Sequence, residues 1–162
     1  EGENMSQVDT SLLKPELVYF DFEAADFRDF FKKLGKKLAP QGYLNDSWYD
    51  AIVRRETAYP TGLEFEKISV AIPHVEPENI AKPYIAIVRP KGPIPFEPMA
   101  GMVDHPVQTQ LIVNLGLVAH DEDQVAVLQS MMGIFMDEAA VADILSQTTG
   151  EGMVAAFERY ID

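Results

Sequence analysis

The apolar run over residues 110–118 limits most strongly how this chain can fold. Apart from its first residue, only Asn114 and Gly116 interrupt it. A run of this length without alternating polar residues predicts a strand that is buried on both faces, at the centre of a sheet with helices on each side. Two shorter apolar runs, residues 68–72 and 84–89, are each followed by a proline, which ends a strand because it has no backbone N–H to donate.

Amphipathic helices are expected around these strands. Between residues 24 and 38, apolar residues recur at steps of three and four beside lysines, which predicts a helix. A short aromatic and β-branched run favours a strand over residues 17–22. The spacing of apolar residues and capping residues favours further helices over residues 45–56, from Asp121 onward, over residues 138–147 and over residues 150–160.

The helix that begins near Asp121 opens with three acidic residues, which suit the positive end of its dipole. Its spacing predicts that four apolar side chains are buried, namely Val125, Leu128, Met132 and Phe135. Prolines restrict residues 91–98 to an edge strand or a loop. Helices before, between and after the strands predict an α/β fold, with a mixed β-sheet sandwiched between helices on both faces.

Length and charge restrict the organisation of the chain and its partners. The 162 residues suit a single domain over residues 11–162, after a flexible N-terminal segment over residues 1–10. Lys and Arg number 13 and Asp and Glu number 26, which gives a net charge of −13. This charge repels nucleic acid and anionic membranes and favours a protein partner with a positive docking face.

Several kinds of chemistry find no support in the sequence. The chain has no cysteine, which excludes disulfides, thiolate metal sites and a thiol nucleophile. Motifs for zinc, calcium or nucleotide binding are also missing, so we expect no metal and no cofactor. No apolar stretch approaches the roughly 20 residues that cross a bilayer, and the acidic N-terminus is unlike a signal peptide. We therefore expect a cytoplasmic protein without membrane insertion.

Histidine is the side chain best suited to nucleophilic or acid–base chemistry near neutral pH, and the chain has 3 of them. His74 follows Pro73 at the end of the strand over residues 68–72, where open α/β sheets place ligands. By position alone, His74 also fits a strand-terminal histidine that only bonds to the backbone. We interpret His105 as a turn residue.

Two segments carry a resemblance to a known family. RETAYPTG at residues 55–62 is followed by VAIPH at residues 70–74. Together they resemble the enzyme IIA domains of the fructose-mannitol class of the bacterial phosphoenolpyruvate-dependent sugar phosphotransferase system, and most of all the galactitol-type, single-domain members. The resemblance extends from about residue 43 to residue 135 and implies the mannitol-type enzyme IIA fold.

The resemblance implies a phosphocarrier, a phosphotransferase component that acts through a phosphohistidine. His74 would accept a phosphoryl group from the histidine phosphocarrier protein and pass it to an enzyme IIB component on a separate chain. That component serves the membrane enzyme IIC in sugar uptake, of galactitol type by the resemblance. A neutral imidazole is a good nucleophile toward phosphorus. Arg55 matches the family's arginine, whose planar fork of donors suits phosphoryl oxygens, with a solvated helix end as its alternative interpretation.

The chain also departs from the family pattern. Gln124 stands where mannitol- and fructose-type members have a second histidine, and its amide can donate a hydrogen bond to a phosphoryl oxygen but carries no charge. Thr61 matches the threonine of the family's turn and either binds the phosphoryl group or only shapes the turn. We interpret His120 as a loop residue, with an approach to the site as the alternative, and Glu76 and Glu78 as solvated loop acids.

A second function fits the same resemblance. The chain is then a regulatory enzyme IIA-like protein that signals by phosphorylation of His74 without a dedicated transporter, as nitrogen-type and regulator-fused relatives do. The presence of both Arg55 and His74 favours an active carrier. A generic ligand-binding α/β domain is the third interpretation. The sequence does not identify the sugar, because that choice belongs to the membrane component.

Overall fold

The computed structural model describes residues 8–118 and 121–161, with the backbone alone for residues 121–123. Its elements, in chain order, are η1 (Thr10–Leu12), β1 (Leu13–Phe22), α1 (Phe27–Leu38), η2 (Ala39–Gln41), α2 (Trp48–Ala58), β2 (Gly62–Glu64), β3 (Ser69–Ala71), η3 (Pro77–Asn79), β4 (Tyr84–Pro90), β5 (Ile94–Phe96), β6 (Val107–Thr109), β7 (Leu111–Gly116), α3 (Asp121–Phe135), α4 (Glu138–Ser146) and α5 (Gly150–Tyr160).

The chain is packed against the domain from Val8, the first residue described. Of the segment expected to be flexible, residues 1–7 lie outside the described residues. Val8 is 2% exposed and belongs to the apolar core. The Asp9 side chain accepts a hydrogen bond from the Ser11 backbone N–H at 3.0 Å and so caps η1. Val8 and Asp9, which precede the expected start of the domain at residue 11, are therefore part of the folded domain.

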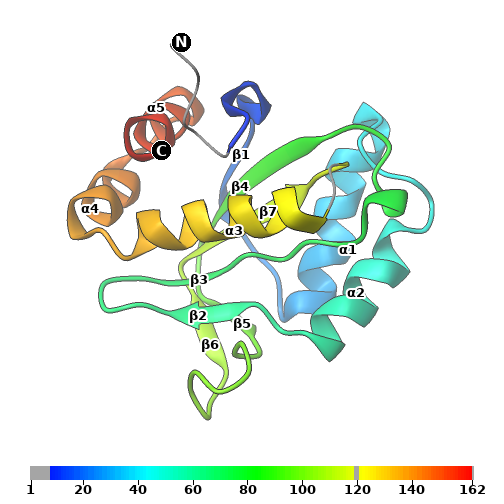
Figure 1. Ribbon diagram of the computed structural model, residues 1–162, viewed down its shortest axis with the longest axis horizontal. Coiled ribbons are helices and arrows are strands. Elements are labelled where there is room, and N and C mark those ends of the chain that lie inside the picture. Colours follow the sequence, from blue (N-terminus) through cyan, green and yellow to red (C-terminus); the bar gives the residue numbers. More distant parts are fainter. Residues whose placement is uncertain (1–7, 119–120, 162) are drawn as a thin grey trace.

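Five strands form a mixed sheet in the order β1-β4-β7-β3-β2 (Figure 1). The strand β1 runs parallel to β4, and β3 runs parallel to β7. The pairs β4 with β7 and β2 with β3 are antiparallel. The apolar run forms β7, the central strand, and every residue of β7 is buried. The predicted α/β fold with a mixed sheet is thus confirmed.

Helices cover both faces of this sheet, and each face has its own apolar core. The helices α1 and α2 pack on one face, whereas α3, α4 and α5 pack on the other (Figure 1). Successive side chains of a strand point to opposite faces. In β7, Ile112 therefore packs with α1 and α2, while Leu111, Val113 and Leu115 pack with the other three helices.

The helix α3 buries a different face from the one predicted. Val125 is 51% exposed, and Leu128 and Met132 are half-buried, so only Phe135 is buried as predicted. The side chains that fill the core are Val127, Met131, Ile134 and Phe135. Apolar residues occupy most positions of α3, so spacing alone allowed two faces, and packing against the sheet selected between them. Val125 and Leu128 are left beside the strand ends.

Short strands occur in the turn-rich segments. The strand β2 begins directly after Thr61, and residues 91–98 contain β5, which pairs antiparallel with β6 in a separate two-stranded sheet. The backbone N–H of Gly62 donates to the Glu97 carbonyl oxygen at 3.0 Å. A Cβ at position 62 would lie 2.6 Å from that oxygen. Only glycine lets the two backbones approach this closely.

Candidate functional site

His74 lies just past the end of β3, beside the central strand. The Pro73 carbonyl oxygen accepts hydrogen bonds from the Leu115 backbone N–H and from the Asn114 side-chain amide, each at 3.1 Å. The Nδ1 atom of His74 lies 3.0 Å from the Ile72 carbonyl oxygen. A carbonyl only accepts, so Nδ1 carries the proton and Nε2 keeps its lone pair. The alternative interpretation, a strand-terminal histidine that only bonds to the backbone, also predicts this hydrogen bond. The bond uses only one of the two ring nitrogens, however.

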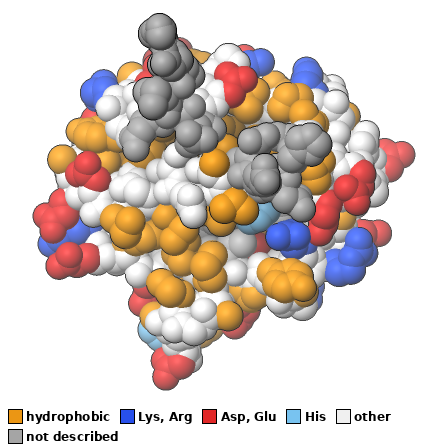
Figure 2. Space-filling model, viewed as in Figure 1, with side chains coloured by type: hydrophobic (Ala, Val, Ile, Leu, Met, Phe, Trp, Pro, Cys, Tyr) orange, Lys and Arg blue, Asp and Glu red, His pale blue; other side chains and the backbone are white. Residues whose placement is uncertain are grey.

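A cleft of about 430 Å³ joins His74 to two other parts of the fold. Its walls come from the end of α2, the loop after β3 and the first turns of α3: Arg55, His74, Glu76, Gln124, Val125 and Leu128. Figure 2 shows hydrophobic side chains among charged ones on the face that α3 crosses. The structure therefore brings together Arg55, His74 and Gln124, three of the residues predicted for the site.

Arg55 and Glu76 form an ion pair inside this cleft. The Nη1 atom of Arg55 donates to Oε2 of Glu76 at 2.9 Å. Glu76 is a loop acid whose side chain is 46% exposed, in keeping with the prediction, but its carboxylate is also the counter-ion of Arg55, which the sequence did not predict. Glu78 is exposed, as predicted. The Arg55 guanidinium also lies 5.5 Å from the ring centroid of Tyr59, which is 68% exposed.

The cleft combines a neutral imidazole with a balanced ion pair. Burial lowers the pKa of His74 below its ordinary value, and the positive charge of Arg55 lowers it further, although the hydrogen bond to Ile72 and the charge of Glu76 oppose the shift. The imidazole is therefore neutral at pH 7. The backbone N–H of Glu76 itself, and then Arg55, hold the pKa of the Glu76 carboxyl below its ordinary range, so this group is ionised. The ring is thus in the protonation state that a nucleophile needs.

Gln124 lines the same cleft and carries an unsatisfied donor. Its Nε2 atom is buried and has no hydrogen-bond partner among the described side chains and backbone. A buried donor without a partner costs about 1–3 kcal/mol. An oxygen-bearing group bound beside His74 would supply the missing acceptor. An amide cannot exchange a proton or carry charge, so its contribution is limited to a neutral hydrogen bond.

Thr61 is buried and is not among the residues that line the cleft. Its backbone N–H donates to Oε2 of Glu56 at 2.7 Å, and its hydroxyl donates to the same atom at 3.0 Å. Both donors of Thr61 are therefore engaged. This geometry supports the alternative in which Thr61 shapes the turn.

The two other histidines stand apart from this arrangement. His105 is exposed in the loop before β6, and its Nε2 lies 2.7 Å from Oε2 of Glu64. It does not line the cleft, in keeping with its interpretation as a turn residue. His120 lies outside the described residues.

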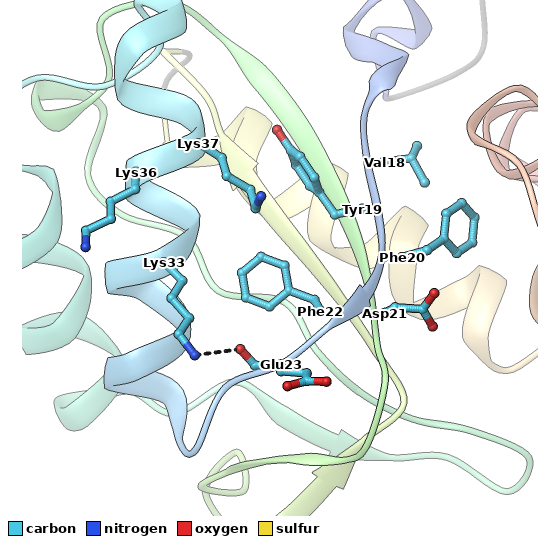
Figure 3. Close-up of a pocket in the computed structure, with 9 residues that line it drawn as sticks. All are labelled: Val18, Tyr19, Phe20, Asp21, Phe22, Glu23, Lys33, Lys36 and Lys37. Carbon is cyan, nitrogen blue, oxygen red and sulfur yellow. Dashed lines mark hydrogen bonds between the residues drawn. The ribbon is translucent and has the colours of Figure 1, made fainter.

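A separate cavity of about 640 Å³ lies where the edge strand β1 faces α1. Figure 3 shows Lys33 and Lys37 extending from α1 toward this strand, whereas Lys36 extends from the same helix away from it. Lys33 Nζ donates to the Glu23 carbonyl oxygen at 3.0 Å, and Lys37 Nζ lies 5.5 Å from the ring centroid of Tyr19 (Figure 3). None of the residues predicted for the site lines this cavity.

The described residues contain no group of three or more His, Asp or Glu side chains placed to hold a metal ion. Within the same residues, no single helix has the length and apolar character to cross a membrane, although the α3 segment from Gln124 and α4 meet that test jointly as a pair bent by 86°.

The comparison with protein families agrees with the motif at residues 55–62 and 70–74. The family described as "Phosphoenolpyruvate-dependent sugar phosphotransferase system, EIIA 2" matches residues 11–160 of this chain. The chain therefore belongs to this family of enzyme IIA domains and is a component of phosphotransferase type. The galactitol-specific EIIA component of Escherichia coli strain K12 is 27% identical over 108 residues, which cover 67% of this chain and 70% of that protein.

Solved structures share the fold. The nitrogen regulatory protein IIA-Ntr from Neisseria meningitidis has a TM-score of 0.75 at 21% identity and covers 91% of this chain and 97% of its own. The complex of enzyme IIAMTL and phosphorylated enzyme IIBMTL from Escherichia coli has a TM-score of 0.70 at 18% identity, with coverage of 91% and 97%. The predicted mannitol-type fold is confirmed.

Proposed function

We propose that this chain is a phosphocarrier that accepts a phosphoryl group on Nε2 of His74 and passes it on. The observation that carries the proposal is the state of the ring. Nδ1 is held 3.0 Å from the Ile72 carbonyl oxygen, which leaves Nε2 as the nucleophile at a cleft that Arg55 and Gln124 also line. Membership in the enzyme IIA family supports this role. No separate base is needed, because the reacting nitrogen already carries a lone pair.

The transfer is an exchange of one nitrogen–phosphorus bond for another. The lone pair of His74 Nε2 forms the new bond, while the bond in the donor's phosphohistidine breaks and its electron pair returns to the donor nitrogen. Each ring keeps the proton on its other nitrogen. In His74 that proton stays on Nδ1, where the hydrogen bond to Ile72 fixes the tautomer.

Positioning and charge stabilisation supply the catalysis. Phosphoryl transfer passes through a loose transition state, in which negative charge spreads over the three equatorial oxygens. Arg55 contributes a charged, planar fork of donors to these oxygens. Gln124 contributes the amide N–H that otherwise has no partner in the described part of the chain. Arg55 and Gln124 both line the cleft that contains His74, so no large rearrangement is needed to bring them to the phosphoryl group.

The proposed partners are the histidine phosphocarrier protein as donor and an enzyme IIB component as acceptor. Exposed apolar side chains near the cleft offer a common docking face: Tyr59 is 68% exposed, and Val125, which lines the cleft, is 51% exposed. The solved complex of enzyme IIAMTL with phosphorylated enzyme IIBMTL supports the acceptor. The galactitol-specific relative supports a galactitol-type sugar. The membrane enzyme IIC takes up this sugar, and the cytoplasmic carrier serves it only indirectly, through the enzyme IIB component.

A regulatory role is the second candidate. It is favoured by the likeness in fold to the nitrogen regulatory protein IIA-Ntr, at a TM-score of 0.75. In that role His74 is phosphorylated as a signal, and the phosphoryl group does not continue to a transporter. Onward transfer to an enzyme IIB separates the two candidates.

The first experiment measures the intact mass of the chain after incubation with phosphoenolpyruvate, enzyme I and the histidine phosphocarrier protein. We expect a gain of one phosphoryl group that is labile in acid, since phosphohistidine hydrolyses there. The gain should be absent from His74→Ala and present in His105→Ala, whose histidine is exposed and outside the cleft. Circular dichroism of each variant controls for folding. A folded chain that gains no phosphoryl group contradicts the proposal.

A further inference from the structure

Glu76 forms an ion pair with Arg55, the cation that the proposed function assigns to the phosphoryl group. Among the described residues that line the cleft, Arg55 is the only lysine or arginine and Glu76 is the only carboxylate. Their atoms Nη1 and Oε2 lie 2.9 Å apart, at side chains that are 31% and 46% exposed. Once His74 is phosphorylated, two anionic groups face one guanidinium.

We propose that Glu76 competes with the phosphoryl group for Arg55 and thereby raises the free energy of phosphorylated His74, which favours onward transfer. This inference rests on the proposed function, in which His74 carries the phosphoryl group. It assigns to Glu76 a positioning role, because the carboxylate acts through Arg55 and forms no bond to phosphorus.

The effect of Glu76 differs between the two states of the carrier. Before transfer, the carboxylate neutralises Arg55 and holds its guanidinium in the cleft. A phosphoryl group brings about 1.5–2 negative charges and draws the arginine fork to its oxygens. Glu76 then loses its counter-ion while it faces a like charge, in a partly buried cleft where repulsion is stronger than in bulk water. The phosphorylated state is destabilised relative to the unphosphorylated state.

This exchange of partners suits a carrier. A phosphohistidine held by an uncontested arginine would be a stable product, whereas a carrier must release the group to the next protein. The carboxylate adds no proton transfer to the step, because the reacting nitrogen already carries a lone pair and needs no base. The covalent change is still the exchange of one nitrogen–phosphorus bond for another.

Glu78 provides a matched control for Glu76. It lies two residues further along the chain, in η3, and carries the same charge, but it is exposed and does not line the cleft. Replacing either glutamate by glutamine removes one negative charge from the chain. Any effect of overall charge on the binding of a partner protein is therefore common to Glu76→Gln and Glu78→Gln, and a difference between them reports on the cleft.

The experiment measures the phosphoryl exchange equilibrium between the chain and phosphorylated histidine phosphocarrier protein. Intact mass gives the phosphorylated fraction of each protein when transfer has stopped changing. We expect Glu76→Gln to shift this equilibrium about 3- to 10-fold toward the phosphorylated chain and to slow hydrolysis of its phosphohistidine. Glu78→Gln should match the unaltered chain. In an Arg55→Ala background, the shift caused by Glu76→Gln should be smaller, because the competition for Arg55 is gone.

The outcomes separate this inference from the function on which it rests. An unchanged equilibrium in Glu76→Gln, or a shift toward the donor, overturns the competition while His74 remains the acceptor. An equal shift in Glu78→Gln also overturns it, since charge in the cleft is then not responsible. If the unaltered chain is never phosphorylated, the proposed function itself fails. Thermal unfolding of both variants confirms that the compared chains are folded.

Discussion

Glu56 and Thr61 close the turn that joins α2 to β2. The Thr61 backbone N–H donates to the Glu56 carboxylate at 2.7 Å, and its hydroxyl donates at 3.0 Å. Glu56 is 1% exposed, and this burial raises its pKa to about 7, although the hydrogen bonds from Thr61 oppose the rise. Because Glu56 adjoins Arg55 on α2, the same contact fixes the end of the helix that carries the site arginine.

The raised pKa makes the contribution of Glu56 to stability depend on pH. Its carboxyl binds a proton more tightly in the folded state than in the unfolded state, so stability is lost as pH rises from about 4.5 through about 7. We expect the free energy of unfolding of the unaltered chain, relative to Glu56→Gln, to fall by roughly 2–3 kcal/mol between pH 5 and pH 8. Urea unfolding at several pH values measures this difference.

The matched control for this prediction is Glu66→Gln, which removes an exposed carboxyl in the turn after β2. Because this carboxyl is exposed, its removal should change the free energy of unfolding by no more than about 0.5 kcal/mol at each pH. A difference between the unaltered chain and Glu56→Gln that does not vary with pH would show that Glu56 is not protonated in the folded state.

The pKa values of the two described histidines should be shifted in opposite directions. Burial and then Arg55 lower the pKa of His74, whereas the hydrogen bonds that the His105 ring donates to Glu64 and Asp104 raise the pKa of His105. Imidazole resonances followed by NMR against pH should place His74 below and His105 above the usual value of about 6.5. The spectra should also show the Nδ1–H tautomer for neutral His74. Arg55→Gln should raise the pKa of His74 and leave that of His105 unchanged.

Gln124→Ala should slow phosphoryl transfer without loss of stability. If the amide donates to the phosphoryl group, its removal should lower the transfer rate by about 10- to 100-fold. Because this buried donor has no hydrogen-bond partner among the described residues and costs about 1–3 kcal/mol unpaired, its removal should leave the free energy of unfolding unchanged or raise it. Quench-flow transfer from the phosphorylated donor and urea unfolding measure the two quantities.

Gln129→Ala is the control for Gln124, since Gln129 is exposed on the same helix. We expect it to leave both the transfer rate and the stability unchanged. Equal transfer rates in Gln124→Ala and Gln129→Ala would show that the Gln124 amide does not contribute to phosphoryl transfer.

Arg55→Lys should lower the transfer rate although it keeps the charge. A lysine ammonium lacks the planar fork that binds two oxygens at once, so we expect a loss of about 10-fold or more in the rate. Arg54→Lys makes the same change at the exposed neighbour and should leave the rate unaltered. Comparable losses in the two variants would indicate that the effect comes from docking of the donor rather than from the cleft.

Most of the architecture could be predicted from the sequence because it depends on local patterns. The apolar run over residues 110–118 contains β7, and α5 has the predicted bounds. The helix α1 begins at Phe27 rather than at residue 24, because the Asp26 side chain accepts the Asp29 backbone N–H at 2.9 Å and caps it there. The face of α3 was not predictable, since its apolar residues allow two orientations.

The candidate site also has features that could be predicted from the sequence and features that could not. The order of RETAYPTG and VAIPH can be read from the chain alone, and it carries the family and the predicted roles of His74 and Arg55. The pairing of Glu76 with Arg55 across 21 residues of chain, and the place of Gln124 at the cleft without a partner among the described residues, appear only in the folded molecule. Motifs record residues that are neighbours in the chain, whereas ion pairs and unpaired donors depend on distances that exist only after the helices have packed on the sheet.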